Sequence, residues 1–244
     1  MSKTVSWIVA AAGITAAVSG CERAPSVEEI RQVPYESTVV AAHMTDHFYR
    51  MSELQRALIN GDLAATKDPA AWLADHPTSA AVPEAWTELL VPFRSAANRV
   101  VEARDIQAAA TATAQAAGAC GSCHEMLGAD IGFPVEAAPV EGSDVIPHMQ
   151  RHAWASGRMW EGLLGPSALV WQEGARLLGE APLAPAQLDA PIEVLSEVSE
   201  LERRVHALGA QAVEADDQDN RAEIYGRLLG TCARCHRLTG VGSI

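Results

Sequence analysis

The pattern Cys-x-x-Cys-His occurs twice in this chain, as 120–124 and as 232–236. This spacing is typical of covalent haem attachment, in which each thiol forms a thioether with a porphyrin vinyl group and the adjacent His coordinates the iron. On a helix, positions i, i+3 and i+4 share one face, so the three side chains of each motif would point at one cofactor. We therefore predict two c-type haems, held by thioethers to four Cys and by two proximal iron ligands (Cys120, Cys123, Cys232, Cys235, His124 and His236).

A zinc site and a thioredoxin-like redox pair are the alternative uses of closely spaced Cys and His. Zinc sites lack the contiguous order of this motif, and no pattern of alternating strands and helices surrounds either copy. Both alternatives are therefore disfavoured.

The first 20 residues have the pattern of an export signal. Lys3 precedes the apolar run from Trp7 to Val18, which is too short to span a bilayer comfortably. Residues 18–21 read Val-Ser-Gly-Cys and resemble a bacterial lipobox, which implies cleavage before Cys21 and acylation of that Cys. An ordinary signal peptide followed by an incidental Cys is the alternative. We expect a periplasmic protein that is anchored to a bacterial membrane by lipid, without a spanning helix.

The chain is acidic. Its net charge is −13, and removal of residues 1–20 with Lys3 would make it −14. This charge gives no electrostatic footprint for nucleic acid. It would steer the protein towards basic patches on redox partner proteins, or it serves only to maintain solubility.

Apolar residues at helical spacing predict an all-α protein. Hydrophobic residues make up 48% of the chain and aromatic residues only 5%, which favours closely packed helices over strands. From Ser37 the apolar positions recur at intervals of four and three, which predicts a first helix (Val40, Met44, His47, Met51, Leu54 and Leu58). A second helix is expected around Trp72, a third over 84–104 with a kink at Pro92, and a fourth from Asp105 as N-cap to the first haem motif.

The second half of the chain repeats the first. The segment 43–47, His-Met-x-x-His, recurs at an offset of 105, and the haem motif recurs at an offset of 112. The difference of seven residues can be absorbed in loops or in the third and fourth helices. We therefore expect two tandem four-helix bundles, each with one haem near the C-terminal end of its last helix. The expected parts are a signal peptide, a tether, a first bundle, a linker and a second bundle (1–20, 21–36, 37–127, 128–143 and 144–244).

The His-Met-x-x-His segments are the candidates for the sixth iron ligands. In an up-down-up-down bundle the end of the fourth helix lies beside the start of the first, so each segment would face a proximal His. We favour His47 and His152 as the distal ligands. Met44 and Met149 are the alternative and would raise the reduction potential, and an open sixth position is the third choice.

The other four His are treated separately. His43 and His148 lie one turn before the favoured distal ligands and are expected to contact a haem propionate. His76 and His206 are given no role.

The helical context and the position of the motif resemble the cytochrome c′/c-556 family of four-helix-bundle cytochromes, over 37–127 and again over 144–240. In c-556-like members the first helix supplies a Met to the iron, whereas in cytochrome c′ that side is apolar and open and binds nitric oxide or carbon monoxide. This chain differs from both, because it is tandem and has His beside Met at that location.

The resemblance implies a di-haem electron-transfer protein that is not an enzyme. A module that binds or senses nitric oxide or carbon monoxide is the alternative. A di-haem peroxidase-like enzyme is less favoured, because the two halves look alike. Four Trp at helical spacing are expected to be core residues rather than redox residues (Trp86, Trp154, Trp160 and Trp171).

Overall fold

The computed structural model describes residues 25–78, 82–142 and 144–240, and this part of the chain is all-helical, as predicted. The expected signal peptide, the lipobox Cys21 and the first residues of the tether lie outside the described residues. Among the described helices, none is long and apolar enough to cross a membrane.

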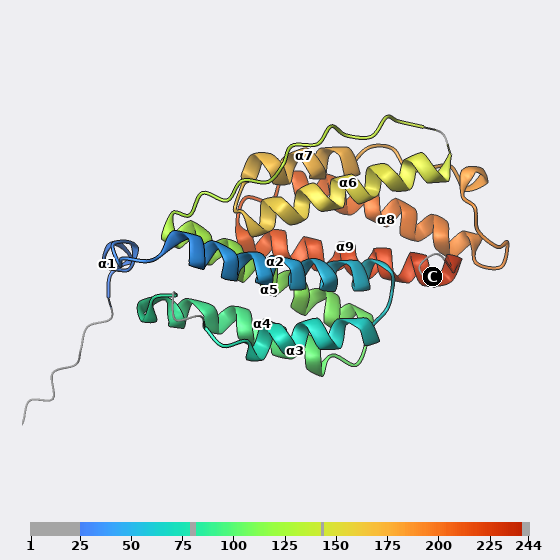
Figure 1. Ribbon diagram of the computed structural model, residues 1–244. Helices are drawn as coiled ribbons and strands as arrows, with labels where there is room; N and C mark the ends of the chain where they lie inside the picture. Colours follow the sequence, from blue (N-terminus) through green and yellow to red (C-terminus); the bar gives the residue numbers. More distant parts are fainter. Residues whose placement is uncertain (1–24, 79–81, 143, 241–244) are drawn as a thin grey trace, which may run out of the picture.

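The two halves of the chain have the same order of longer helices (Figure 1). The first half contains a short N-terminal helix, four longer helices and two 3-10 segments: α1 (Val27–Arg31), α2 (Ser37–Ile59), η1 (Ala64–Thr66), α3 (Lys67–Asp75), η2 (Glu84–Leu90), α4 (Val91–Glu102) and α5 (Ile106–Leu127). The second half contains four longer helices and one 3-10 segment: α6 (Val145–Leu164), α7 (Ala168–Leu178), η3 (Pro185–Gln187), α8 (Leu195–Val213) and α9 (Gln218–Thr239).

The helices that carry the Cys-x-x-Cys-His motifs, α5 and α9, have matching ends. Asp105 and Asp217 are their N-caps, and each side chain accepts a hydrogen bond from the backbone N–H three residues later. Gly128 and Gly240 end the two helices with φ values of 67° and 72°, in the left-handed region that glycine adopts without steric cost. The prediction of Asp105 as an N-cap is confirmed, and both boundaries keep the offset of 112.

The expected third helix over 84–104 differs from the structure. Residues 84–90 form the 3-10 segment η2, and the α-helix α4 begins only at Val91, so that Pro92 stands in its first turn instead of kinking its middle. The first turn is the place in a helix where a missing N–H removes no hydrogen bond.

Helices α5 and α9 pack against each other in the centre of the molecule and run in opposite directions (Figure 1). A Cβ built at Gly226 would lie 3.0 Å from Thr111 Cα, and one built at Gly118 would lie 3.1 Å from Ala222 Cβ. The small residues therefore let the two backbones approach closely. Helices α3 and α4 lie on one side of this pair, and α7 and α8 lie on the other (Figure 1).

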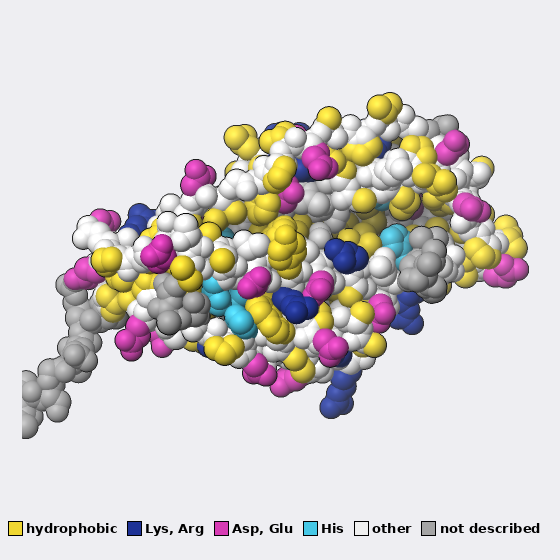
Figure 2. All heavy atoms as spheres, viewed as in Figure 1, with side chains coloured by type: hydrophobic (Ala, Val, Ile, Leu, Met, Phe, Trp, Pro, Cys, Tyr) yellow, Lys and Arg dark blue, Asp and Glu magenta, His cyan; other side chains and the backbone are white. Residues whose placement is uncertain are grey.

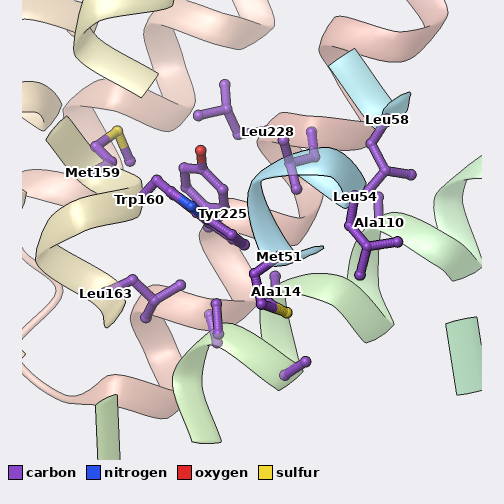
Figure 3. Close-up of a cluster of buried hydrophobic side chains, with 14 of the residues drawn as sticks. Met51, Leu54, Leu58, Ala110, Ala114, Met159, Trp160, Leu163, Tyr225 and Leu228 are labelled. Atoms are coloured by element: carbon purple, nitrogen blue, oxygen red, sulfur yellow. The ribbon is translucent and has the colours of Figure 1, made fainter. Parts of the chain in front are cut away.

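One hydrophobic core runs through both halves. Figure 3 shows Met51 and Leu54 of α2 and Ala114 of α5 close to Trp160 of α6 and Tyr225 of α9. Trp171 is fully buried and Trp160 is 2% exposed, so these two Trp are core residues, as expected. Tyr225 at the centre donates to the Ser156 carbonyl oxygen at 2.9 Å.

The described part of the predicted linker, residues 128–142, is non-helical and lies along the outside of α6 (Figure 1). Its Pro139 and Glu136 carbonyl oxygens accept hydrogen bonds from Arg151 at 2.7 Å and from Trp154 at 3.2 Å, and Phe133 packs against the core. An extended segment is needed because α5 ends at the opposite end of the molecule from the start of α6, so the chain must run back along α6, whose 20 residues span about 30 Å.

The end of the predicted tether is not a free chain. Residues 27–31 form α1, and Ile30 packs against Val82 and Trp86. Trp86 Nε1 donates to the Ile30 carbonyl oxygen at 3.1 Å, and Arg31 donates to the Met126 carbonyl oxygen at 2.6 Å. This short helix is therefore fixed against the C-terminal end of α5, close to the first motif.

Candidate cofactor sites

The two Cys-x-x-Cys-His motifs lie in the last turns of α5 and α9, at opposite ends of the molecule (Figure 1). At the end that holds the first motif, α2 contributes its first half and α6 contributes its last turn. At the other end, α6 contributes its first half and α2 contributes its last turn. The first motif lies near the N-terminal half of α2, and the second lies near the N-terminal half of α6. This is the neighbourhood that an up-down-up-down bundle predicts.

A cavity of about 420 Å³ adjoins the first motif. Cys120, Cys123 and His124 lie on one wall, and Met44 and His47 lie on another. The remaining lining is mostly apolar and comes from α2, η2, α4, α5, the linker and α6 (Ala41, Thr45, Phe48, Met51, Leu89, Leu90, Phe93, Ala119, Asp130, Ile131, Gly132, Phe133 and Leu164). The volume lies within the range of about 300–1,000 Å³ that is usual for ligand and cofactor pockets.

His124 is oriented by the other half of the chain. Its Nδ1 lies 2.8 Å from the carbonyl oxygen of Leu164, the last residue of α6. A carbonyl oxygen only accepts, so Nδ1 carries the proton and Nε2 is left as the free ligand atom. This is the usual arrangement of a metal-binding imidazole, which is fixed by a hydrogen bond from its other nitrogen.

His236 has an equivalent environment at the other end of the molecule. Burial lowers the pKa of His236, and the backbone carbonyl of Ile59, the last residue of α2, opposes this shift. Nδ1 of His236 nevertheless has no hydrogen-bond partner with normal geometry among the described residues. Ile59 and Leu164 are related by the offset of 105. Each motif His therefore faces the C-terminal end of the first longer helix of the opposite half.

Among the described residues, the Cys pairs do not belong to any group of three or more potential metal ligands. All four are free thiols, and burial raises the pKa of Cys120 and Cys232 to about 12 and that of Cys123 and Cys235 to about 11. Free thiolates, which thiol exchange requires, are therefore disfavoured. Addition of a thiol across a vinyl group removes the ionisable proton altogether.

The first His-Met-x-x-His segment forms a cluster with His76, at the end of α3. The ring centroids of His43 and His47 are 4.5 Å apart, and that of His76 lies 5.2 Å from His43. His47 also stacks on Phe93 and lines the cavity, whereas His43 does not line it. The Nε2 atoms of both His43 and His47 are buried without a hydrogen-bond partner in the described part of the chain.

Burial and neighbouring basic groups lower the pKa of His47 and His43. Burial, together with His43, His76 and Arg94, lowers the pKa of His47 to about 3. Burial also lowers the pKa of His43, and His76 and Arg94 add to the effect. A neutral imidazole has a free lone pair, so His47 is ready to bind a metal at neutral pH.

The second His-Met-x-x-His segment forms a different cluster. His148 and His152 meet Glu202 and His206 of α8, and one nitrogen or oxygen atom of each residue lies within 4.8 Å of the others. Burial lowers the pKa of His152 to about 3 even though Glu202 opposes this. Burial alone would raise the pKa of Glu202, but hydrogen bonds from His148 and His206 hold it far below its usual value.

The structure thus brings together most of the predicted site residues. His43 and His148, predicted to contact propionates, are buried in the two His clusters. Met149 is half-buried. The lipidation site Cys21 lies outside the described residues. Figure 2 shows that His side chains reach the surface in two separate areas of the face in view.

Three residues of the two clusters were not predicted from the sequence. His76 has no periodic partner, and no local pattern could have found it. Glu202 and His206 are spaced i, i+4 on α8, which places them on one face and is a signal that could have been used.

Comparison of the chain with protein-family models, with curated proteins and with solved structures found no match.

Proposed function

We propose that this chain is a di-haem c-type cytochrome that carries electrons. The observation that supports this most is the apolar cavity beside α5, because it is lined by Cys120, Cys123 and His124 and also by Met44 and His47. A haem c in each site would supply one-electron chemistry between ferric and ferrous iron.

In the first site, Cys120 and Cys123 would hold the porphyrin. His124 would offer Nε2 to the iron, because its Nδ1 proton is used in the hydrogen bond to Leu164. His47 is the favoured distal ligand and Met44 the alternative, since both line the cavity. The apolar lining would exclude water and so favour a stable ligand set over exchange with solvent.

In the second site, Cys232, Cys235 and His236 would take the same roles. The equivalent ends of α5 and α9, and the common contact of each motif His with the last residue of α2 or α6, support two copies of one unit. We infer two tandem four-helix bundles, α2–α5 and α6–α9, that share one core.

The sequence features outside the described residues complete the proposal. The lipobox at 18–21 would place a lipid on Cys21 and hold the protein at a bacterial membrane, in the periplasm where haem c is attached. The net charge of −13 would favour redox partners with basic docking patches.

The test is to express the chain in a host that attaches haem c and to measure covalent haem per chain, with low-temperature EPR during a redox titration. We expect two haems per chain and low-spin ferric signals from both. Chain without covalent haem would overturn the proposal. Five-coordinate ferrous iron that binds carbon monoxide would favour the gas-binding function instead.

A further inference from the structure

We propose that His148, His152, Glu202 and His206 form a binding site for a divalent transition metal ion of the zinc class, in addition to the haem sites. The four residues come from α6 and α8. None of them belongs to a Cys-x-x-Cys-His motif, but His152 is also the favoured distal ligand of the second haem, so binding of this ion and of that iron by His152 exclude each other.

The ligand atoms converge on one point. His206 Nε2 lies 3.2 Å from His152 Nε2, 3.4 Å from His148 Nε2 and 3.0 Å from Glu202 Oε1. Tetrahedral zinc with bonds of 2.0–2.1 Å keeps its ligand atoms about 3.3 Å apart. The distance of 2.6 Å between His148 Nε2 and Glu202 Oε1 is that of a hydrogen bond, and a small outward movement would admit an ion.

The chemistry of these four groups suits a cation. Three imidazoles and one carboxylate are typical ligands of zinc and its neighbours in the transition series. Glu202 is 3% exposed, and its Oε1 also accepts a hydrogen bond from the Leu183 N–H at 3.2 Å, which fixes its orientation. A carboxylate buried among three imidazoles is already the negative partner that a dication requires.

An ion can reach the cluster from the surface. A cleft of about 460 Å³ is lined by His148, His152 and His206 and continues past Glu141, Arg151 and Glu180. Arg151 forms an ion pair with Glu180, so its positive charge is compensated at the entrance. Glu141 remains as an acidic group on the same route.

The corresponding cluster in the first half lacks these features. At the offset of 112, Leu90 stands in place of Glu202 and Arg94 in place of His206. The correspondence is supported by burial, because Phe93, Ala96, Ala97 and Val100 match four buried residues of α8 (Val205, Leu208, Gly209 and Ala212). The charge of Arg94 lowers the pKa of His47, and it would repel a metal ion in the same way.

The two halves would therefore differ in function. With His152 bound to this ion, the sixth position of the second haem would pass to Met149, which also gives a low-spin ferric haem. The first half would keep an apolar cavity with His47 or Met44 as ligand.

The test uses the full, untagged, haem-loaded protein, stripped with a chelator and then supplied with Zn²⁺ alone. We expect one Zn²⁺ per chain after desalting, and zinc-edge X-ray absorption that shows three imidazoles and one oxygen at about 2.0–2.1 Å. Isothermal titration should give an affinity that falls by at least about 100-fold in Glu202→Gln and in His206→Ala. Glu202→Gln preserves shape, which separates loss of the ion from loss of folding, and circular dichroism checks both variants.

The matched control is His76→Ala, which alters the cluster in the first half and should leave the affinity for Zn²⁺ unchanged. No Zn²⁺ retained by the wild-type protein, or equal affinity in wild type, Glu202→Gln and His206→Ala, would overturn the proposal. Covalent haem is counted separately, so a failure of the haem proposal would not be confused with a failure of this one.

Discussion

At the scale of single residues, all eight His of the chain belong to four groups near the two ends of the molecule. Two follow the Cys pairs, and six form the two clusters. Burial keeps the pKa of His47 and His152 near 3, so these rings have free lone pairs at neutral pH. Burial of such rings is costly as long as nothing binds their free nitrogen atoms, because His47 Nε2 has no hydrogen-bond partner among the described residues.

The choice between His47 and Met44 can be tested by substitution. In His47→Ala we expect the EPR signal of iron with two imidazole ligands to disappear from the first haem, because the favoured distal ligand is removed. In Met44→Ala, the matched change one turn away in the same cavity, we expect the signal of the first haem to persist. The reverse result would assign the ligand to Met44, and signals unchanged in both variants would exclude a distal ligand from α2.

The sequence was sufficient for part of the site. The fixed spacing of the Cys-x-x-Cys-His motif, and the i, i+4 spacing of His43 and His47, predicted groups of residues that share a helix face. The spacing could not predict which residues of other helices meet them. His76, Glu202 and His206 reach the clusters through tertiary packing, for which a single sequence gives no register.

At the scale of helices, local signals predicted some boundaries and missed others. The cap residue Asp105 and the apolar stripe of α2 are local patterns, and both elements form as expected. The start of α4 was missed, because a Pro within an apolar pattern fits both a kinked helix and a new helix start. The offset between the two halves is 105 at the end of α6 and 112 at Glu202. The seven extra residues of the second half therefore lie between these two points, where a longer connection with η3 precedes α8.

The contact between α6 and α7 depends on glycine. A Cβ built at Gly162 would lie 2.7 Å from Trp171 Cα, which is backbone and has no room to move away. We expect Gly162→Ala to lower the free energy of unfolding by about 1–3 kcal/mol, through overpacking. Urea unfolding monitored by circular dichroism measures this change.

Gly157→Ala is the matched control on the same helix. A Cβ at this position would meet no atom within 4 Å. The variant should be stabilised by up to about 1 kcal/mol, because alanine has the higher helix propensity. Equal effects of the two substitutions would show that α7 does not pack against Gly162 in solution.

At the scale of the whole molecule, the two halves share one core, to which α2, α5, α6 and α9 all contribute (Figure 3). The repeat in the sequence predicted two similar sets of helices. It could not predict that α5 and α9 would pack directly against each other, since this contact joins residues far apart in the chain. The fused core fixes the distance between the two motifs, which separate domains on a flexible linker would not do.

The proposed haems should therefore behave independently. Gly226 of α9 packs against Thr111 and Ala114 of α5, and His124 and His236 each lie about ten residues beyond this contact, in opposite directions. At 1.5 Å per residue the two His are about 30 Å apart along the helices. A change of one unit of charge at one haem alters the free energy of reducing the other by about 0.5 kcal/mol at an effective dielectric constant of about 20. This corresponds to a shift of about 20 mV in the reduction potential, and salt screens the interaction further.

Two single-haem variants provide the measurement, with Cys120→Ser/Cys123→Ser matched to Cys232→Ser/Cys235→Ser. We expect the redox titration of the wild-type protein to equal the sum of the two variant titrations, with neither potential displaced by more than about 20 mV. A larger displacement, in variants that keep the wild-type helix content, would mean that the two cofactors lie much closer together than the antiparallel packing of α5 and α9 allows. Agreement would support a separation of about 30 Å between the two cofactors, as the antiparallel packing of α5 and α9 implies.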